Sequence, residues 1–171
     1  MNSSADSPTV ILDAARIRRS VQRIARQIHE DFHNADQLVL VAIAGQGTVL
    51  ADRIAAELIE ISDGHVLSTV LTMHKDEPLD HDISIAPDLG DQLKGATVVV
   101  VDDVLNSGRT LLYAVRYLLG YSPRTVAACV LVDRIHRRFP IRADYVGLSL
   151  STTLQSHITV KLSGDDVALL S

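Results

Sequence analysis

Residues 97–110 read TVVVVDDVLNSGRT, and they join a buried strand to a loop of a kind that binds phosphate. Thr97 to Val101 is apolar and β-branched, which is typical of a strand covered on both faces. Ser107, Gly108 and Thr110 then begin a stretch with helical spacing. Backbone N–H groups at the start of a helix bind phosphate, helped by hydroxyl donors, and glycine lets the backbone approach the ligand closely.

Two carboxylates, Asp102 and Asp103, stand between this strand and the loop. A phosphate would repel them, so we interpret them as acceptors for the hydroxyl groups of a sugar attached to that phosphate. The alternative is a solvated strand end followed by a helix cap at Ser107. The pair Ser107-Gly108 alone favours that alternative, whereas the complete run favours a site for a sugar phosphate.

The same order of strand, loop and helix occurs earlier in the chain. Leu38 to Ile43 is an apolar run that stops at Ala44-Gly45-Gln46-Gly47, and helical spacing follows. Apolar strands that alternate with helices predict an α/β fold with a central, mostly parallel sheet flanked by helices. Ligands of such sheets bind at the carboxyl ends of the strands. The predicted strands are 38–43, 66–73, 97–101, 126–132, 145–148 and 157–162, and the predicted helices are 14–33, 50–61 and 107–119.

The composition is that of an ordinary globular chain, with 171 residues of which 47% are hydrophobic and 22% charged. We predict one domain over residues 1–171, with residues 1–9 disordered. One cysteine excludes an intramolecular disulfide, and neither a signal peptide nor a membrane-spanning run is visible, so we expect a cytoplasmic protein without membrane contact. The net charge of −5 disfavours a surface devoted to nucleic acid but allows a local basic patch.

Residues 97–110 resemble the phosphoribosyl pyrophosphate (PRPP) signature of type I phosphoribosyltransferases, an apolar strand followed by two acids and a Ser/Thr-Gly-x-Thr loop. Residues 130–134, 136–137 and 140–147 resemble one branch in particular, the PyrR family of pyrimidine operon attenuators and uracil phosphoribosyltransferases. The resemblance begins at Val10 and runs nearly to the C-terminus. It implies the type I phosphoribosyltransferase fold, with a small hood and a flexible lid loop, and we expect a homodimer or homotetramer.

The resemblance implies a Mg²⁺-dependent phosphoribosyltransferase that moves a phosphoribosyl group from PRPP to a nucleobase, uracil or a related pyrimidine, and releases pyrophosphate. The lid would be the stretch 74–91, with Lys75 as its catalytic cation and His74 as a second choice, although both could equally belong to a solvated loop. The remaining roles are assigned by position in the family motifs: Asp102 and Asp103 for the ribose hydroxyls, Asn106, Ser107, Gly108, Arg109 and Thr110 for the 5′-phosphate, Gly45, Gln46 and Gly47 for the pyrophosphate, and Asp133 and Arg134 for the base pocket.

Two of the segments assigned to PRPP depart from the family pattern. Gly45-Gln46-Gly47 replaces the usual Thr-Arg-Gly of the pyrophosphate loop, and His74-Lys75-Asp76 replaces Arg-Asp-Asp at the start of the lid. Gln46 cannot supply the charge-assisted contact of an arginine. An alternative hypothesis is therefore a protein that binds PRPP or a nucleotide but has weakened catalysis.

A second alternative is an RNA-binding transcriptional attenuator that senses nucleotides. A stripe of arginines lies along the first helix, and more basic residues follow residue 134. These arginines could equally form ion pairs within the protein or between subunits. Leu148 and Leu154 stand where the family has basic residues. The candidate RNA-binding residues are Arg19, Arg23, His136, Arg137 and Arg142.

Overall fold

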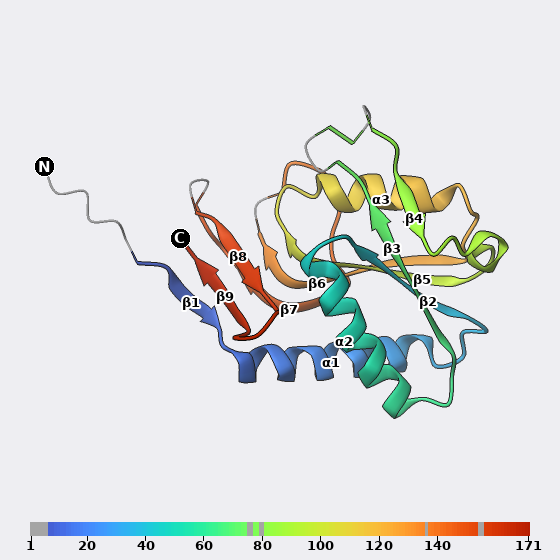
Figure 1. Ribbon diagram of the computed structural model, residues 1–171, viewed down its shortest axis with the longest axis horizontal. Helices are drawn as coiled ribbons and strands as arrows, with labels where there is room; N and C mark the ends of the chain where they lie inside the picture. Colours follow the sequence, from blue (N-terminus) through green and yellow to red (C-terminus); the bar gives the residue numbers. More distant parts are fainter. Residues whose placement is uncertain (1–6, 75–76, 79–80, 136, 154–155) are drawn as a thin grey trace, which may run out of the picture.

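The computed structural model of the chain describes residues 7–74, 77–78, 81–135, 137–153 and 156–171. Its main element is a six-stranded sheet (Figure 1). Neighbouring strands are parallel except at one edge, where the outermost strand is antiparallel, which confirms the prediction of a mostly parallel sheet. The strands in spatial order are β4 (Ser84–Ala86), β3 (Val66–Thr72), β2 (Leu38–Ile43), β5 (Thr97–Leu105), β6 (Thr125–Arg134) and β7 (Tyr145–Leu150).

Helices cover both faces of this sheet (Figure 1). On one face α1 (Ala14–Phe32) and α2 (Gln46–Ile61) pack against the strands, and on the other face α3 (Arg109–Leu119) does so. The valines of β5 alternate between these layers, since Val99 and Val101 belong to the first core and Val98 and Val100 to the second. Within the described residues, no helix combines the length and apolar character that crossing a membrane requires.

A second sheet brings the beginning and the end of the described chain together. Its three antiparallel strands are β1 (Thr9–Leu12), β9 (Val167–Leu170) and β8 (Ile158–Lys161), with β9 in the middle. This sheet is the small hood that the resemblance implies. The sequence predicts β8 but neither β1 nor β9, and the expected disorder extended to Thr9, which instead pairs with Leu170.

Three predicted boundaries are wrong where two elements meet. β5 continues to Leu105 instead of ending at Val101, because β6 extends beside it and pairs Asp133 with Leu105. Gln46 and Gly47 lie in the first turn of α2 and not in a loop, and α3 begins at Arg109. The stretch 74–91, expected to be a loop, contains β4 and the start of a 3₁₀ turn, η1 (Gly90–Leu93).

An ion pair fastens the hood to the main sheet's helical layer. Arg53 of α2 donates to both carboxylate oxygens of Asp166, at 2.5 and 3.0 Å, and to the carbonyl oxygen of Leu162 at 2.7 Å. The hydrogen bond raises the pKa of Arg53 and lowers the pKa of Asp166 from its ordinary value. The contact is half buried, so solvent weakens it less than a fully exposed pair.

Replacing Asp166 by asparagine should lower the free energy of unfolding by about 1–2 kcal/mol at neutral pH, because one charge-assisted, two-point contact is lost. The folded pKa of Asp166 is depressed, so its contribution is complete above the unfolded pKa of about 4 and is lost as the pH falls through the folded value. Urea unfolding of both proteins at several pH values measures this. Asp165→Asn removes an exposed neighbouring charge as the control, and an equal loss in both variants would contradict the assignment.

Candidate functional site

The carboxyl ends of β2, β5 and β6 lie side by side, at the same end of the parallel strands. β5 is hydrogen-bonded in parallel to β2 on one side and to β6 on the other, so all three strands end together. Gly45 follows β2, the acid pair lies in the last part of β5, and Asp133 lies near the end of β6. The fold therefore brings three of the predicted site segments to the same edge, as expected for ligand binding in a parallel sheet.

The two acids of β5 lie in different environments. The Asp102 side chain is buried, and its Oδ1 accepts a hydrogen bond from the backbone N–H of Asp103 at 3.0 Å. Asp103 is half buried. A cavity of about 180 Å³ is lined by residues 102–111 together with Ile158 of β8. The acids and the loop thus line one cavity, and the hood contributes one of its walls.

The loop that follows β5 is held from behind by a distant segment. The carbonyl oxygen of Ser107 accepts hydrogen bonds from the backbone N–H groups of Arg138 at 2.9 Å and Phe139 at 3.0 Å. The hydroxyl oxygen of Ser107 accepts from Arg109 N at 3.3 Å, which is the local capping contact. The guanidinium carbon of Arg109 lies 5.8 Å from the centre of the Phe139 ring. The loop is therefore supported before any ligand binds.

Gly108 is the residue of this loop with the least freedom to change. It has φ = 87°, in the left-handed region, and a Cβ placed there would lie 2.7 Å from Ile141 Cγ2. The sequence indicates why glycine suits this position, but the contact with Ile141 is non-local and could not be predicted. The first turn of α3 follows directly, and its N–H groups have no partners within the helix. These groups are suited to a phosphate.

The glycine loop after β2 lies against β5. A Cβ at Gly47 would lie 2.9 Å from the carbonyl oxygen of Val101, so only glycine allows α2 to begin this close to the acid pair. Gly45 has φ = 109° and is exposed. Gln46 turns toward the hood, where its Oε1 accepts a hydrogen bond from Leu162 N at 2.8 Å. The side chain that replaces the family's arginine thus connects α2 to the hood.

The predicted base-pocket residues both contact other parts of the protein. Asp133 is buried and forms an ion pair with Arg137. Among the described residues, Asp133 Oδ1 and Arg137 Nε are buried without a hydrogen-bond partner. Arg134 donates to Thr152 Oγ1 at 2.6 Å and to the carbonyl oxygen of Thr153 at 2.7 Å. Arg134 therefore supports the segment after β7, and Asp133 keeps an unsatisfied acceptor near the end of β6.

The predicted lid is described only in part. Lys75, its catalytic cation in our interpretation, and Asp76 lie outside the described residues. His74 is described and exposed, between β3 and β4. Glu77 and His81 lie beside it, and the sequence predicts no such grouping, although all three residues fall within one eight-residue stretch.

The candidate RNA-binding arginines do not form one free surface. Arg19 and Arg142 are exposed. Arg23 donates to the carbonyl oxygens of Val146 and Gly147, at 2.9 Å each, and so fastens α1 to β7. Arg137 pairs with Asp133. His136 and Leu154 lie outside the described residues, and Leu148 is half buried.

The acid pair also fits a magnesium ion. Carboxylate oxygens are the hard ligands that Mg²⁺ prefers, usually together with phosphate oxygens of a substrate. Asp103 lines the cavity beside the phosphate-type loop. The residues present are therefore suited to hold Mg²⁺ next to a phosphorylated ligand.

Comparisons with known proteins agree with this geometry. The family described as "Phosphoribosyl transferase domain" matches residues 9–163. The protein named bifunctional protein PyrR from Streptomyces coelicolor is 41% identical over 162 residues, which are 91% of this chain and 84% of that protein. A protein of the same name from Brevibacillus brevis is 39% identical, over 93% of this chain and 92% of that protein.

Solved structures share the fold at low sequence identity. A hypoxanthine phosphoribosyltransferase from Staphylococcus aureus superposes with a TM-score of 0.72 and 22% identity, covering 90% of this chain and 85% of that chain. One from Trypanosoma cruzi has a TM-score of 0.73 and 18% identity, covering 88% and 84%. The predicted type I fold is confirmed.

Gly108→Ala should destabilise the protein by about 1–3 kcal/mol, because alanine is strained at positive φ and its methyl group meets Ile141. Gly45→Ala is the matched control, since Gly45 also has positive φ but a Cβ there would have nothing within 4 Å. Thermal unfolding should show the larger loss for Gly108→Ala, and adding Ile141→Ala should recover the steric part. Equal losses in both alanine variants would show that the contact with Ile141 is unimportant.

Proposed function

Because this chain belongs to the type I phosphoribosyltransferase family, in the branch of proteins named bifunctional protein PyrR, we propose that it transfers a phosphoribosyl group from PRPP to a nucleobase. The observation that carries the proposal is the shared cavity. One continuous stretch, residues 102–111, supplies both a carboxylate pair and the start of a helix to its walls. A sugar phosphate presents the complementary groups, hydroxyls and a dianion, within one molecule.

In this proposal the 5′-phosphate binds at the first turn of α3. Backbone N–H groups there are donors, and the helix dipole favours negative charge. Asn106, Ser107 and Thr110 line the same cavity and offer polar side chains to the phosphate oxygens. Gly108 allows the close approach. The ribose then extends toward β5, where Asp102 and Asp103 accept hydrogen bonds from its hydroxyl groups.

The reaction needs positioning more than a nucleophilic side chain. A ring nitrogen of the base forms a bond to the anomeric carbon, and the bond from that carbon to pyrophosphate breaks with its electron pair leaving on pyrophosphate. The proton that the base loses passes to the released pyrophosphate or to water. Positive charge develops on the ribose ring and negative charge on the leaving pyrophosphate. In this arrangement the carboxylates of the acid pair lie beside the ribose and stabilise the positive charge on its ring. Mg²⁺, when held with the pyrophosphate oxygens, offsets the second.

The base would lie toward the end of β6, next to the acid pair. Asp133 Oδ1, a buried acceptor without a partner among the described residues, fits an N–H group of a base such as uracil or a related pyrimidine. Satisfying this oxygen would remove an energetic cost that the protein bears without ligand. Lys75 remains our candidate for the pyrophosphate. The glycine loop at Gly45 to Gly47, which abuts β5, remains the candidate pyrophosphate loop.

Because the Gln46 side chain binds the hood, the alternative of a PRPP-binding protein with weak catalysis must be tested against the enzyme hypothesis. Incubation with PRPP, Mg²⁺ and each base in turn, followed by detection of the nucleotide and of pyrophosphate, decides between the two. We expect product with uracil or another pyrimidine. If PRPP binds in calorimetry but no base gives product, the enzyme hypothesis fails and the binding hypothesis stands.

The paired variant Asp102→Asn and Asp103→Asn should stay folded and bind PRPP at least about tenfold more weakly, because amides are poorer acceptors for ribose hydroxyls and for Mg²⁺. Calorimetry measures the affinity, and circular dichroism checks the fold. Asp63→Asn serves as the control, because it changes an exposed acid in the turn before β3, at the amino ends of the strands and away from the cavity. Unchanged PRPP affinity in the paired variant would show that the acids have another role.

RNA binding is a second candidate function, favoured by the exposed guanidinium groups of Arg19 and Arg142 and by the word bifunctional in the relatives' name. Arg19→Ala with Arg142→Ala should weaken binding to a structured RNA and reduce its salt dependence. Arg124→Ala, another exposed arginine, is the control. No RNA binding at low salt by the parent protein would end this hypothesis.

A further inference from the structure

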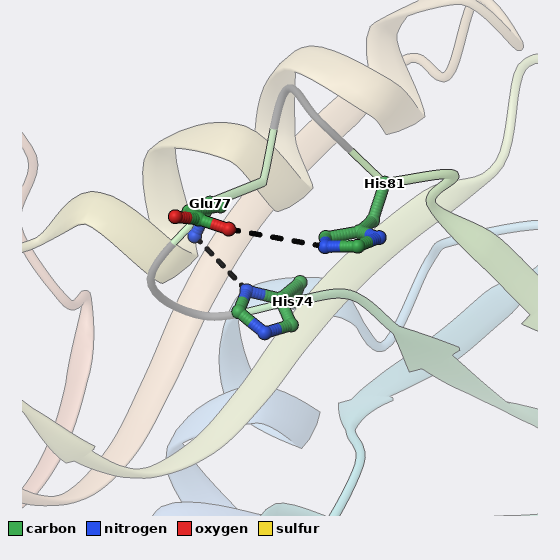
Figure 2. A group of neighbouring side chains, drawn as sticks. All are labelled: His74, Glu77 and His81. Carbon is green, nitrogen blue, oxygen red and sulfur yellow. Dashed lines mark hydrogen bonds and ion pairs between the residues drawn. The ribbon is translucent and has the colours of Figure 1, made fainter.

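Two histidines and a glutamate gather in the segment between β3 and β4 (Figure 2). His74, Glu77 and His81 each offer one ligand atom, and these atoms all lie within 4.8 Å of one another. All three side chains are exposed. Among the described residues, this is the one group of three or more His, Cys, Asp or Glu side chains whose ligand atoms lie close enough to share a metal ion.

Three contacts hold the group together. The backbone N–H of Glu77 donates to His74 Nδ1 at 3.1 Å, and Glu77 Oε2 lies 3.9 Å from His81 Nε2. The two imidazole rings have centroids 4.5 Å apart and are tilted by 39°. Figure 2 shows a ring nitrogen of His74 directed toward the backbone nitrogen of Glu77 and a ring nitrogen of His81 directed toward the Glu77 carboxylate.

Ordinary surface contacts account poorly for this arrangement. The side chains of His81 and Glu77 are 54% and 62% exposed, and an exposed pair at 3.9 Å contributes little to stability. A metal ion would bind both imidazole rings and the carboxylate at once, and so replace these weak contacts by coordinate bonds.

We propose that His74, Glu77 and His81 bind a divalent transition metal of the zinc class. Two imidazole nitrogens and one carboxylate oxygen form a known type of zinc ligand set, in which water fills the fourth position. Imidazole disfavours Mg²⁺ and Ca²⁺, which take oxygen ligands. The site is therefore chemically distinct from the acid pair of β5.

The segment must tighten slightly to bind the ion. Zinc bonds of about 2.0–2.2 Å place tetrahedral ligand atoms about 3.4 Å apart, which is closer than the separation in the metal-free arrangement. If His74 binds the ion through Nδ1, it gives up the hydrogen bond that this atom accepts from the Glu77 N–H. That N–H belongs to an exposed residue, so water can replace the lost acceptor.

Binding would join the two ends of the segment. His74 lies just after β3 and His81 just before β4, so one ion connects the chain on both sides of the intervening residues. The same segment adjoins α3: His81, Asp82 and Ile83 line a cavity of about 460 Å³ together with Tyr113, Arg116 and Tyr117. The metal would therefore restrain the predicted lid beside the helix whose first turn forms the phosphate site.

Titration of the metal-free full chain with Zn²⁺, followed by calorimetry, tests the site without any substrate. We expect one ion per chain, and Co²⁺ should give the visible absorption of a tetrahedral site. His74→Ala and His81→Ala should each weaken binding at least about tenfold, since each removes one of three protein ligands. His65→Ala changes an exposed histidine just before β3, at the amino end of that strand, and this variant should bind like the parent.

Hydrogen exchange gives an independent readout. Zn²⁺ should slow exchange in peptides spanning residues 74–83 of the parent protein, but not in the double variant His74→Ala, His81→Ala. No binding at about 100 μM Zn²⁺ would overturn the proposal. Equal affinity of the parent and the folded double variant would also overturn it, because the ion would then lie elsewhere. Transferase activity enters neither measurement, so failure here leaves the proposed function unaffected.

Discussion

Strand β5 is the element on which the site depends. It is hydrogen-bonded to β2 and β6 on its two sides, and its valines are buried against helices on both faces. Such a strand cannot slide along its neighbours without breaking two ladders and exposing apolar side chains. The acid pair and the start of α3 therefore have fixed positions relative to each other. Because these groups of the protein are in position before a ligand binds, binding costs less conformational entropy.

Local patterns predicted the parts of this arrangement that depend on local physics. The apolar run that forms most of β5 and the loop at Ser107 and Gly108 that leads into α3 are properties of neighbouring residues. The extent of β5 was missed because its last residues are held in the strand by β6, and no local pattern reports a partner strand. β1 and β9 were missed for the same reason, since two four-residue strands are stable only when paired.

Long-range contacts decide which candidate residues face a ligand and which face the protein. Arg23 belongs in the sequence to a stripe of arginines, yet β7 provides two carbonyl oxygens for its guanidinium group. The sequence presents Gln46 as a weak substitute for an arginine, yet its side-chain oxygen accepts a hydrogen bond from Leu162 N. Ile158 lines the cavity although it lies about fifty residues after the acids. Sequence spacing contains none of this information.

Two kinds of metal ligand lie at the carboxyl ends of the strands, and their chemistry makes the two groups select different metals. Asp102 and Asp103 present hard oxygens beside a phosphate-type loop, which suits Mg²⁺ bound with a phosphorylated substrate. His74 and His81 present borderline nitrogens, which suit zinc and its neighbours. Affinity for imidazole rises strongly from Mg²⁺ to the later transition metals, so abundant Mg²⁺ would not displace the second ion.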